Sequence, residues 1–114
     1  MAFSLKTRKV GAVVVVDMSG RLTGGEGVQS LRSAVRAAVD SGSLKFVFNL
    51  GDVSHIDSSG LGELITCYTT VRNKEGDIRL LKLTARAKDL LQMTKLLTVF
   101  EAFDDEQKAL DSLR

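Results

Sequence analysis

The segment from Asn49 to Gly62 reads NLGDVSHIDSSGLG. It follows the apolar run from Leu44 to Leu50, which predicts a buried strand, and it precedes apolar residues at helical spacing. The tetrapeptide Asp57-Ser58-Ser59-Gly60 between them is a helix-start signal, because short polar side chains accept hydrogen bonds from the first backbone N–H groups of a helix. Ser58 is therefore predicted at an exposed strand-to-helix turn that is held by regular elements on both sides.

The composition is typical of a soluble α/β domain without disulfides. The chain has 114 residues, of which 44% are hydrophobic and 26% charged, and this suits a single domain over residues 1–114. Cys67 is the only cysteine, which fits a reducing compartment. No apolar run approaches the roughly 20 residues that span a bilayer, and the start of the chain lacks a signal-peptide core. We expect a cytoplasmic protein with no membrane insertion.

Charge and motifs argue against nucleic-acid binding and against catalysis. The net charge is +2 and the charges are interspersed, which is too little for a nucleic-acid footprint. The segment Gly24-Gly25-Glu26-Gly27 lacks the Gly-Lys-Ser/Thr end of a phosphate loop. His55 is the only histidine, too few ligands for a metal site, and Cys67 is expected to be an inert thiol. We expect no metal, no cofactor and no enzymatic activity.

Strands and helices alternate along the chain. A hairpin of two strands, Phe3 to Lys9 and Ala12 to Met18, is followed by a glycine-rich segment, Ser19 to Gly27, that predicts a flexible loop. The remaining elements are expected to be a helix at about 28–40, a strand at 44–50, a helix at about 58–73, a strand at 77–83, a helix at 85–93, a short fifth strand at 99–100 and a helix opening at 104. This order predicts an α/β fold with a mixed sheet of four to five strands, its first strand antiparallel, and about four helices.

The hexapeptide DSSGLG, Asp57 to Gly62, resembles the phosphorylation-site signature of the anti-sigma-factor antagonist (anti-anti-sigma factor) family, which carries the STAS domain. Gly20 and Leu22 after the second strand, the turn within Leu90 to Leu97 and the element order agree with that resemblance, which spans essentially the whole chain. It implies a bacterial regulator that binds an anti-sigma factor with serine-kinase activity and so releases a sigma factor. It also implies that the kinase phosphorylates Ser58 and ends the binding, and that a serine phosphatase restores it.

The resemblance places partner-binding residues around Ser58. The expected contacts come from Asp57, Ser59, Gly60, Leu61 and Gly62, from Glu63, Thr66 and Thr70 on the exposed side of the following helix, and from the loop of Arg21, Thr23, Gly24 and Gly25. Arg21 and Thr23 stand where family members often carry acids, which favours a divergent partner. A phosphate on Ser58 would add roughly −1.5 to −2 charges to this surface, at a helix N-terminus that tolerates an anion.

Other interpretations remain open at the level of sequence. Ser58, Ser59 and Asp57 are also good helix caps, and Asp57 could in addition position the nucleotide of a kinase. The cations Lys82, Arg86, Lys88 and Lys95 form either a solvated face or a patch for an acidic partner. The chain could also be a STAS subunit of a larger complex, a transporter-ATPase accessory or a stressosome-type scaffold, without a phosphorylation switch. The sequence leaves the sigma factor, the kinase and the oligomeric state open.

Overall fold

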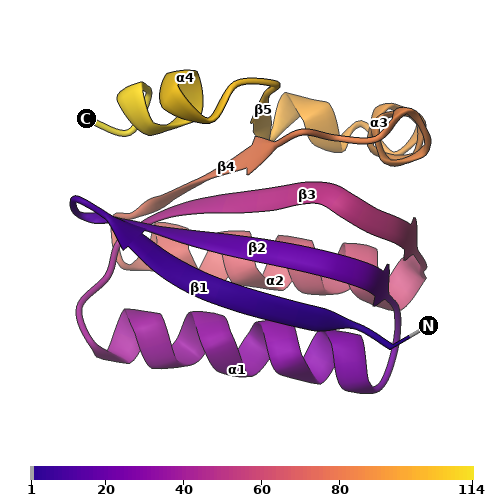
Figure 1. Ribbon diagram of the computed structural model, residues 1–114, viewed down its shortest axis with the longest axis horizontal. Helices are drawn as coiled ribbons and strands as arrows, with labels where there is room; N and C mark the ends of the chain where they lie inside the picture. The colour runs from indigo at the N-terminus through magenta and orange to yellow at the C-terminus, as the bar shows by residue number, and fades with distance from the viewer. Residues whose placement is uncertain (1) are drawn as a thin grey trace.

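The computed structural model describes residues 2–114, which form a five-stranded sheet flanked by helices (Figure 1). The strands are β1 (Ser4–Val10), β2 (Val13–Leu22), β3 (Lys45–Ile56), β4 (Asp77–Leu81) and β5 (Glu101–Phe103). The helices are α1 (Glu26–Asp40), α2 (Ser58–Asn73), α3 (Ala85–Met93) and α4 (Glu106–Asp111), with a 3₁₀ turn at Leu96–Thr98. The strand order is β1-β2-β3-β4-β5; the first pair is antiparallel and the others are parallel. The predicted mixed α/β fold is confirmed.

Strand β2 is buried on both of its faces. Val14 and Val16 pack into the core under α1 and α2, whereas Val13 and Val15 face α4. Figure 1 shows α1 and α2 side by side along one side of the sheet and α4 on the opposite side. Coverage on both sides explains why this run is continuously apolar rather than alternating.

The larger core lies between the sheet and the pair α1 and α2. Leu31 of α1 and Leu64 of α2 pack in one cluster with Phe46 and Phe48 of β3, and all four side chains are fully buried. Burial of each such side chain stabilises the fold by about 1.5–3 kcal/mol. This core fixes the position of α2, and therefore of its first residue, against the sheet.

Two strands are longer than the sequence predicts. β2 continues to Leu22 and β3 to Ile56, although the sequence analysis assigned Ser19 to Gly27 to a loop and ended the third strand at Leu50. Their pairing continues through register shifts between Asp17 and Ser19 and between Gly20 and Arg21. Such bulges let a strand with polar residues and glycine stay paired while it bends, and they carry the sheet out to the Ser58 turn.

The fifth strand is displaced from its predicted position. The sequence analysis placed it at residues 99–100, but Phe100 is buried and its ring meets that of Tyr68 edge-on, with 5.0 Å between the centroids. The strand begins at Glu101, two residues after the predicted start, and Glu101 pairs with Arg79 of β4. The Phe100 side chain therefore packs in the core, and residues Glu101–Phe103 form the last strand of the sheet.

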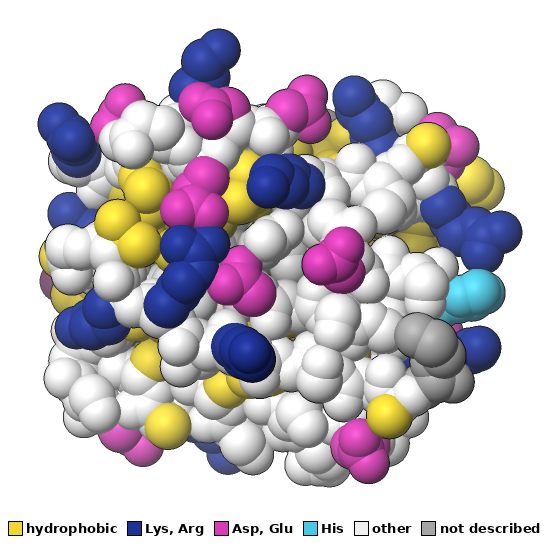
Figure 2. All heavy atoms as spheres, in the orientation of Figure 1, with side chains coloured by type: hydrophobic (Ala, Val, Ile, Leu, Met, Phe, Trp, Pro, Cys, Tyr) yellow, Lys and Arg dark blue, Asp and Glu magenta, His cyan; other side chains and the backbone are white. Residues whose placement is uncertain are grey.

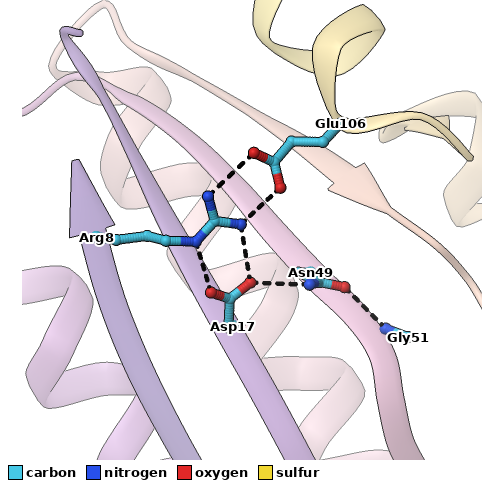
Figure 3. A network of polar contacts seen from close by, with 5 residues as sticks. All are labelled: Arg8, Asp17, Asn49, Gly51 and Glu106. Carbon is cyan, nitrogen blue, oxygen red and sulfur yellow. Dashed lines mark hydrogen bonds and ion pairs between the residues drawn. The ribbon is translucent and has the colours of Figure 1, made fainter. Parts of the chain in front are cut away.

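A network of polar contacts joins α4, which follows the edge strand β5, to β1 at the other edge of the sheet (Figure 3). Arg8 of β1 donates from Nε to Asp17 Oδ2 at 2.7 Å and from Nη2 to Glu106 Oε1 of α4 at 2.6 Å. Asn49 of β3 donates to the second oxygen of Asp17 at 2.8 Å. The Arg8 guanidinium holds the pKa of Asp17 and that of Glu106 below their usual range, and the two carboxylates raise the pKa of Arg8.

Removal of Arg8 should make the free energy of unfolding less dependent on pH in the acidic range. A carboxyl group whose pKa is lowered by folding stabilises the native state above its unfolded pKa of about 4, and this contribution is lost as the pH falls through the folded value. Arg8→Met should lower the free energy of unfolding at pH 7 by about 1 kcal/mol, because the network is partly solvent-screened. Urea unfolding between pH 7 and pH 3 should show a smaller decrease for Arg8→Met than for the wild type. Arg36→Met serves as the control, and equal pH slopes for Arg8→Met and the wild type would contradict this assignment.

Candidate functional site: the strand-to-helix turn at Ser58

The turn between β3 and α2 is built around the carboxylate of Asp57. Asp57 has an extended backbone, and its Oδ1 accepts a hydrogen bond from the backbone N–H of Gly60 at 2.8 Å, so it is the N-cap of α2. Ser58 is the first helical residue, and both Ser58 and Ser59 are exposed. Within residues 2–114 the structure records no hydrogen bond from the Ser58 side chain. The prediction of an exposed serine at a helix start is confirmed.

The same carboxylate holds the loop between β2 and α1. Asp57 Oδ2 accepts from the backbone N–H of Gly24 at 3.1 Å, and the Asp57 N–H donates to the Leu22 carbonyl at 3.4 Å. The backbone N–H of Gly60, with the largest effect, and that of Gly24 lower the pKa of the Asp57 carboxyl group. The loop that carries Thr23, together with Arg21 at the end of β2, is thus fixed beside the start of α2.

Asp57→Ala should release both backbone contacts at once. We expect faster amide hydrogen exchange at Gly24 and Gly60, because each amide loses its acceptor. Exchange measured by NMR should change at these two amides and stay unchanged in the centre of β3. Asp52→Ala is the matched control, since Asp52 is an exposed acid of β3. Unchanged exchange at Gly24 in Asp57→Ala would show that the loop is held by other contacts.

Gly60 lets the helix start approach the end of β2 directly. A Cβ at position 60 would overlap the Leu22 carbonyl oxygen and lie 3.2 Å from Ile56 Cγ2. Gly62, two residues further along α2, has open space where an added Cβ would lie. The two glycines of the DSSGLG segment therefore have different roles, and only Gly60 is required by packing.

Gly60→Ala and Gly62→Ala should have opposite effects on stability. Gly60→Ala forces α2 away from Leu22 and should lower the free energy of unfolding by about 1–3 kcal/mol, the usual cost of overpacking. Gly62→Ala should raise it by up to about 1 kcal/mol, because alanine restricts the unfolded chain and favours helix. Chemical denaturation of the two variants tests this difference. A Gly60→Ala variant as stable as Gly62→Ala would disprove the packing constraint.

The structure separates the predicted partner-binding residues by exposure. Arg21, Asp57, Ser59, Gly62 and Thr66 are exposed, and Thr23, Leu61 and Thr70 are half-buried. Gly60 is buried against β2, so its contribution to a docking surface is through the backbone shape of the turn. The exposed residues of this group lie at the start and along the first turns of α2, and Arg21 lies at the end of β2, next to the loop held by Asp57.

The prediction that Glu63 lies on the exposed side of α2 was wrong. Its side chain is 2% exposed, and Oε1 accepts from Arg32 Nη2 of α1 at 2.7 Å. The other oxygen accepts from the Cys67 thiol at 3.4 Å. Burial and the nearby Glu63 raise the pKa of Cys67, so the thiol stays protonated. The four-residue spacing of Glu63 and Cys67 was the available signal, because it places both side chains on the same helical face.

The sequence analysis did not identify Arg32 as a partner of Glu63. Arg32 lies on α1, 31 residues away from Glu63 in the chain, and only the packing of α1 beside α2 brings the two together. No group of three or more potential metal-ligating side chains is present in residues 2–114. Within the same residues, none of the helices combines the length and the apolarity needed to cross a bilayer.

Comparison with known proteins assigns the family. The model of the STAS domain family matches residues 4–109. The chain belongs to the STAS domain family. Among curated proteins, this STAS domain is 21% identical over 101 residues to BtrV of Bordetella bronchiseptica, provisionally named an anti-sigma factor antagonist; the match covers 89% of this chain and 86% of BtrV.

Several solved structures share the fold of this STAS domain. An anti-sigma factor antagonist from Mycobacterium paratuberculosis superposes with a TM-score of 0.85 at 22% identity, covering 99% of this chain and 95% of that protein. The Bacillus cell fate determinant SpoIIAA, solved in its phosphorylated form, superposes with a TM-score of 0.75 at 24% identity, covering 99% and 100% of the two chains. SpoIIAA has also been solved in its unphosphorylated form, with a TM-score of 0.74.

Proposed function

We propose that this STAS domain is an anti-sigma factor antagonist and that phosphorylation of Ser58 switches it off. The observation that carries the proposal is an exposed serine side chain at the first residue of α2, within DSSGLG. The names of the relatives support the antagonist role, and the phosphorylated form of SpoIIAA supports a phosphorylation switch. In this proposal the chain acts in the cytoplasm by binding its partner, and catalysis belongs to the kinase and the phosphatase.

The modification is a phosphoryl transfer from ATP. The Ser58 Oγ attacks the γ-phosphorus, an O–P bond forms, the bond from that phosphorus to the leaving ADP breaks, and the hydroxyl proton passes to a base of the kinase. The product phosphate lies at the N-terminus of α2, where backbone N–H groups and the helix dipole favour an anion. We expect the fold to survive the modification, because the Ser58 side chain is exposed and Asp57 caps the helix.

Phosphorylation would act on binding through charge. The anti-sigma factor would cover the Ser58 turn, so a phosphate there would be buried without a cationic partner and would meet repulsion from Asp57. Burial of an unpaired charge costs several kcal/mol, and about 4 kcal/mol corresponds to a thousandfold loss of affinity. Hydrolysis of the phosphate by a serine phosphatase would restore binding.

Incubation with the anti-sigma factor kinase and ATP tests the site. Intact-mass measurement should show one added phosphate on the wild type and none on Ser58→Ala. Ser59→Ala is the matched control, because Ser59 is the adjacent exposed serine, and it should be labelled like the wild type. Labelling that persists in Ser58→Ala and disappears in Ser59→Ala would move the site by one residue.

Binding of the anti-sigma factor separates this function from a role as a subunit of a larger complex. The unmodified chain should bind it, and the phosphorylated chain should bind it about a thousandfold more weakly, as measured by calorimetry. A chain that is never labelled and instead co-purifies stoichiometrically with a transporter ATPase or a stressosome-type scaffold would contradict the proposal.

A further inference from the structure

Two exposed arginines and the histidine form a row across the carboxyl end of the sheet. Arg21 of β2 lies opposite His55 of β3 in the strand register, and residues opposed in neighbouring strands point to the same face. Arg86 of α3 approaches His55 from the other side, with 3.2 Å between Arg86 Nη1 and His55 Nε2. Because a guanidinium only donates hydrogen bonds, Nε2 is the acceptor in this contact. We call Arg21, His55 and Arg86 the basic row.

The basic row adjoins the Ser58 turn. Arg21 immediately precedes Leu22, whose carbonyl accepts from the N–H of Asp57. On the neighbouring strand, His55 is three residues before Ser58. Figure 2 shows the histidine of the chain at one edge of the molecule, between basic side chains. A protein that covers the Ser58 turn would therefore also meet this row.

The two arginines of the row differ from most arginines of the chain in having no acidic partner. Five arginines form ion pairs with carboxylates: Arg8, Arg32, Arg72, Arg79 and Arg114. Arg21, Arg36 and Arg86 form none with any acid of residues 2–114. Two of these three unpaired guanidinium groups flank His55, whereas Arg36 lies on the exposed side of α1.

The acid nearest to the row in sequence is already engaged. Asp57 uses Oδ1 for the N–H of Gly60 and Oδ2 for the N–H of Gly24. Its two oxygens thus hold the backbone of the turn, and no ion pair joins them to the guanidinium groups of residues 2–114. The row keeps two positive charges available to a partner.

We propose that the basic row binds carboxylate side chains on an acidic surface of the anti-sigma factor. This inference rests on the proposed function and adds the chemistry of the partner surface. Guanidinium groups pair with carboxylates in a planar, two-point geometry, and charge complementarity of this kind sets the association rate and the choice of partner. Nucleic acid is a poorer fit, because tight binding to phosphates takes many contacts and Figure 2 shows acidic side chains interspersed with the basic ones.

The row also strengthens the proposed switch. A phosphate on Ser58 would stand beside the carboxylates that the row recruits, and it would repel them. Phosphorylation would then remove attractive contacts in addition to adding a buried charge.

A double variant with reversed charges at Arg21 and Arg86, compared with a control variant at Arg36, tests the basic row. The probe is the recombinant anti-sigma factor that binds the unphosphorylated wild-type chain. Arg21→Glu combined with Arg86→Glu should bind it at least about tenfold more weakly, whereas Arg36→Glu should bind like the wild type. Raising sodium chloride from about 50 to about 300 mM should weaken wild-type binding more than binding of the double variant. Arg21→Gln combined with Arg86→Gln should give an intermediate loss, and it replaces the charge-reversed pair if that pair does not fold by circular dichroism.

The outcomes separate this inference from the proposed function. A double variant that binds as tightly as the wild type overturns the acidic-partner inference and leaves the antagonist function standing. A wild-type chain that binds no anti-sigma factor of its own organism overturns the antagonist function and this inference with it. Binding to a DNA duplex or to phosphatidylglycerol vesicles that is lost in the double variant, with unchanged binding to the anti-sigma factor, would assign the row to phosphates and overturn the proposal.

Discussion

One carboxylate joins the two segments of chain that make up the candidate surface. Asp57 accepts from the backbone of α2 through one oxygen and from the loop after β2 through the other. A side chain with a single acceptor could start the helix but could not also hold Gly24. At the same turn, Gly60 lies so close to the Leu22 carbonyl that a Cβ at position 60 would overlap it. Contacts to the backbone thus hold the turn in place, and the Ser58 side chain takes no part in them.

The contacts that hold the turn do not involve the Ser58 side chain. The capping contacts belong to Asp57, and the packing contacts belong to Gly60. The core under α2 holds the rest of the helix through Leu64 and Val71, which are fully buried. A group added at Ser58 therefore changes the surface that a partner meets and leaves the supporting contacts in place.

The distribution of ion pairs separates supporting charges from available ones. Arg8 connects the first strand to α4, and Arg32 neutralises the buried Glu63 between α1 and α2. In both pairs a carboxylate neutralises the guanidinium group at a contact between two secondary-structure elements. Arg21 and Arg86, which lie at the carboxyl end of the sheet, have no such partner, so the uncompensated charge collects beside the turn that carries Ser58. Ligands of open α/β sheets bind at this end of the strands.

Much of the fold and the position of the central residue follow from local patterns. Helical spacing predicted α2 at residues 58–73 and α3 at 85–93, and the element order predicted the antiparallel first pair. These features depend on periodicity and on hydrogen bonds between residues a few positions apart, which a sequence displays directly.

The sequence by itself determined the α/β order of elements and an exposed Ser58 at the start of a helix, because caps and apolar periodicity act locally. Only the tertiary structure decided that Glu63 is buried, that β2 and β3 extend beyond their apolar runs, and that His55 has Arg21 opposite it on β2 and Arg86 of α3 within 3.2 Å. Those outcomes depend on strand register and helix packing between distant residues. That Arg32 meets an acid is likewise decided by which elements pack together, since Arg32 and Glu63 lie 31 residues apart in the chain.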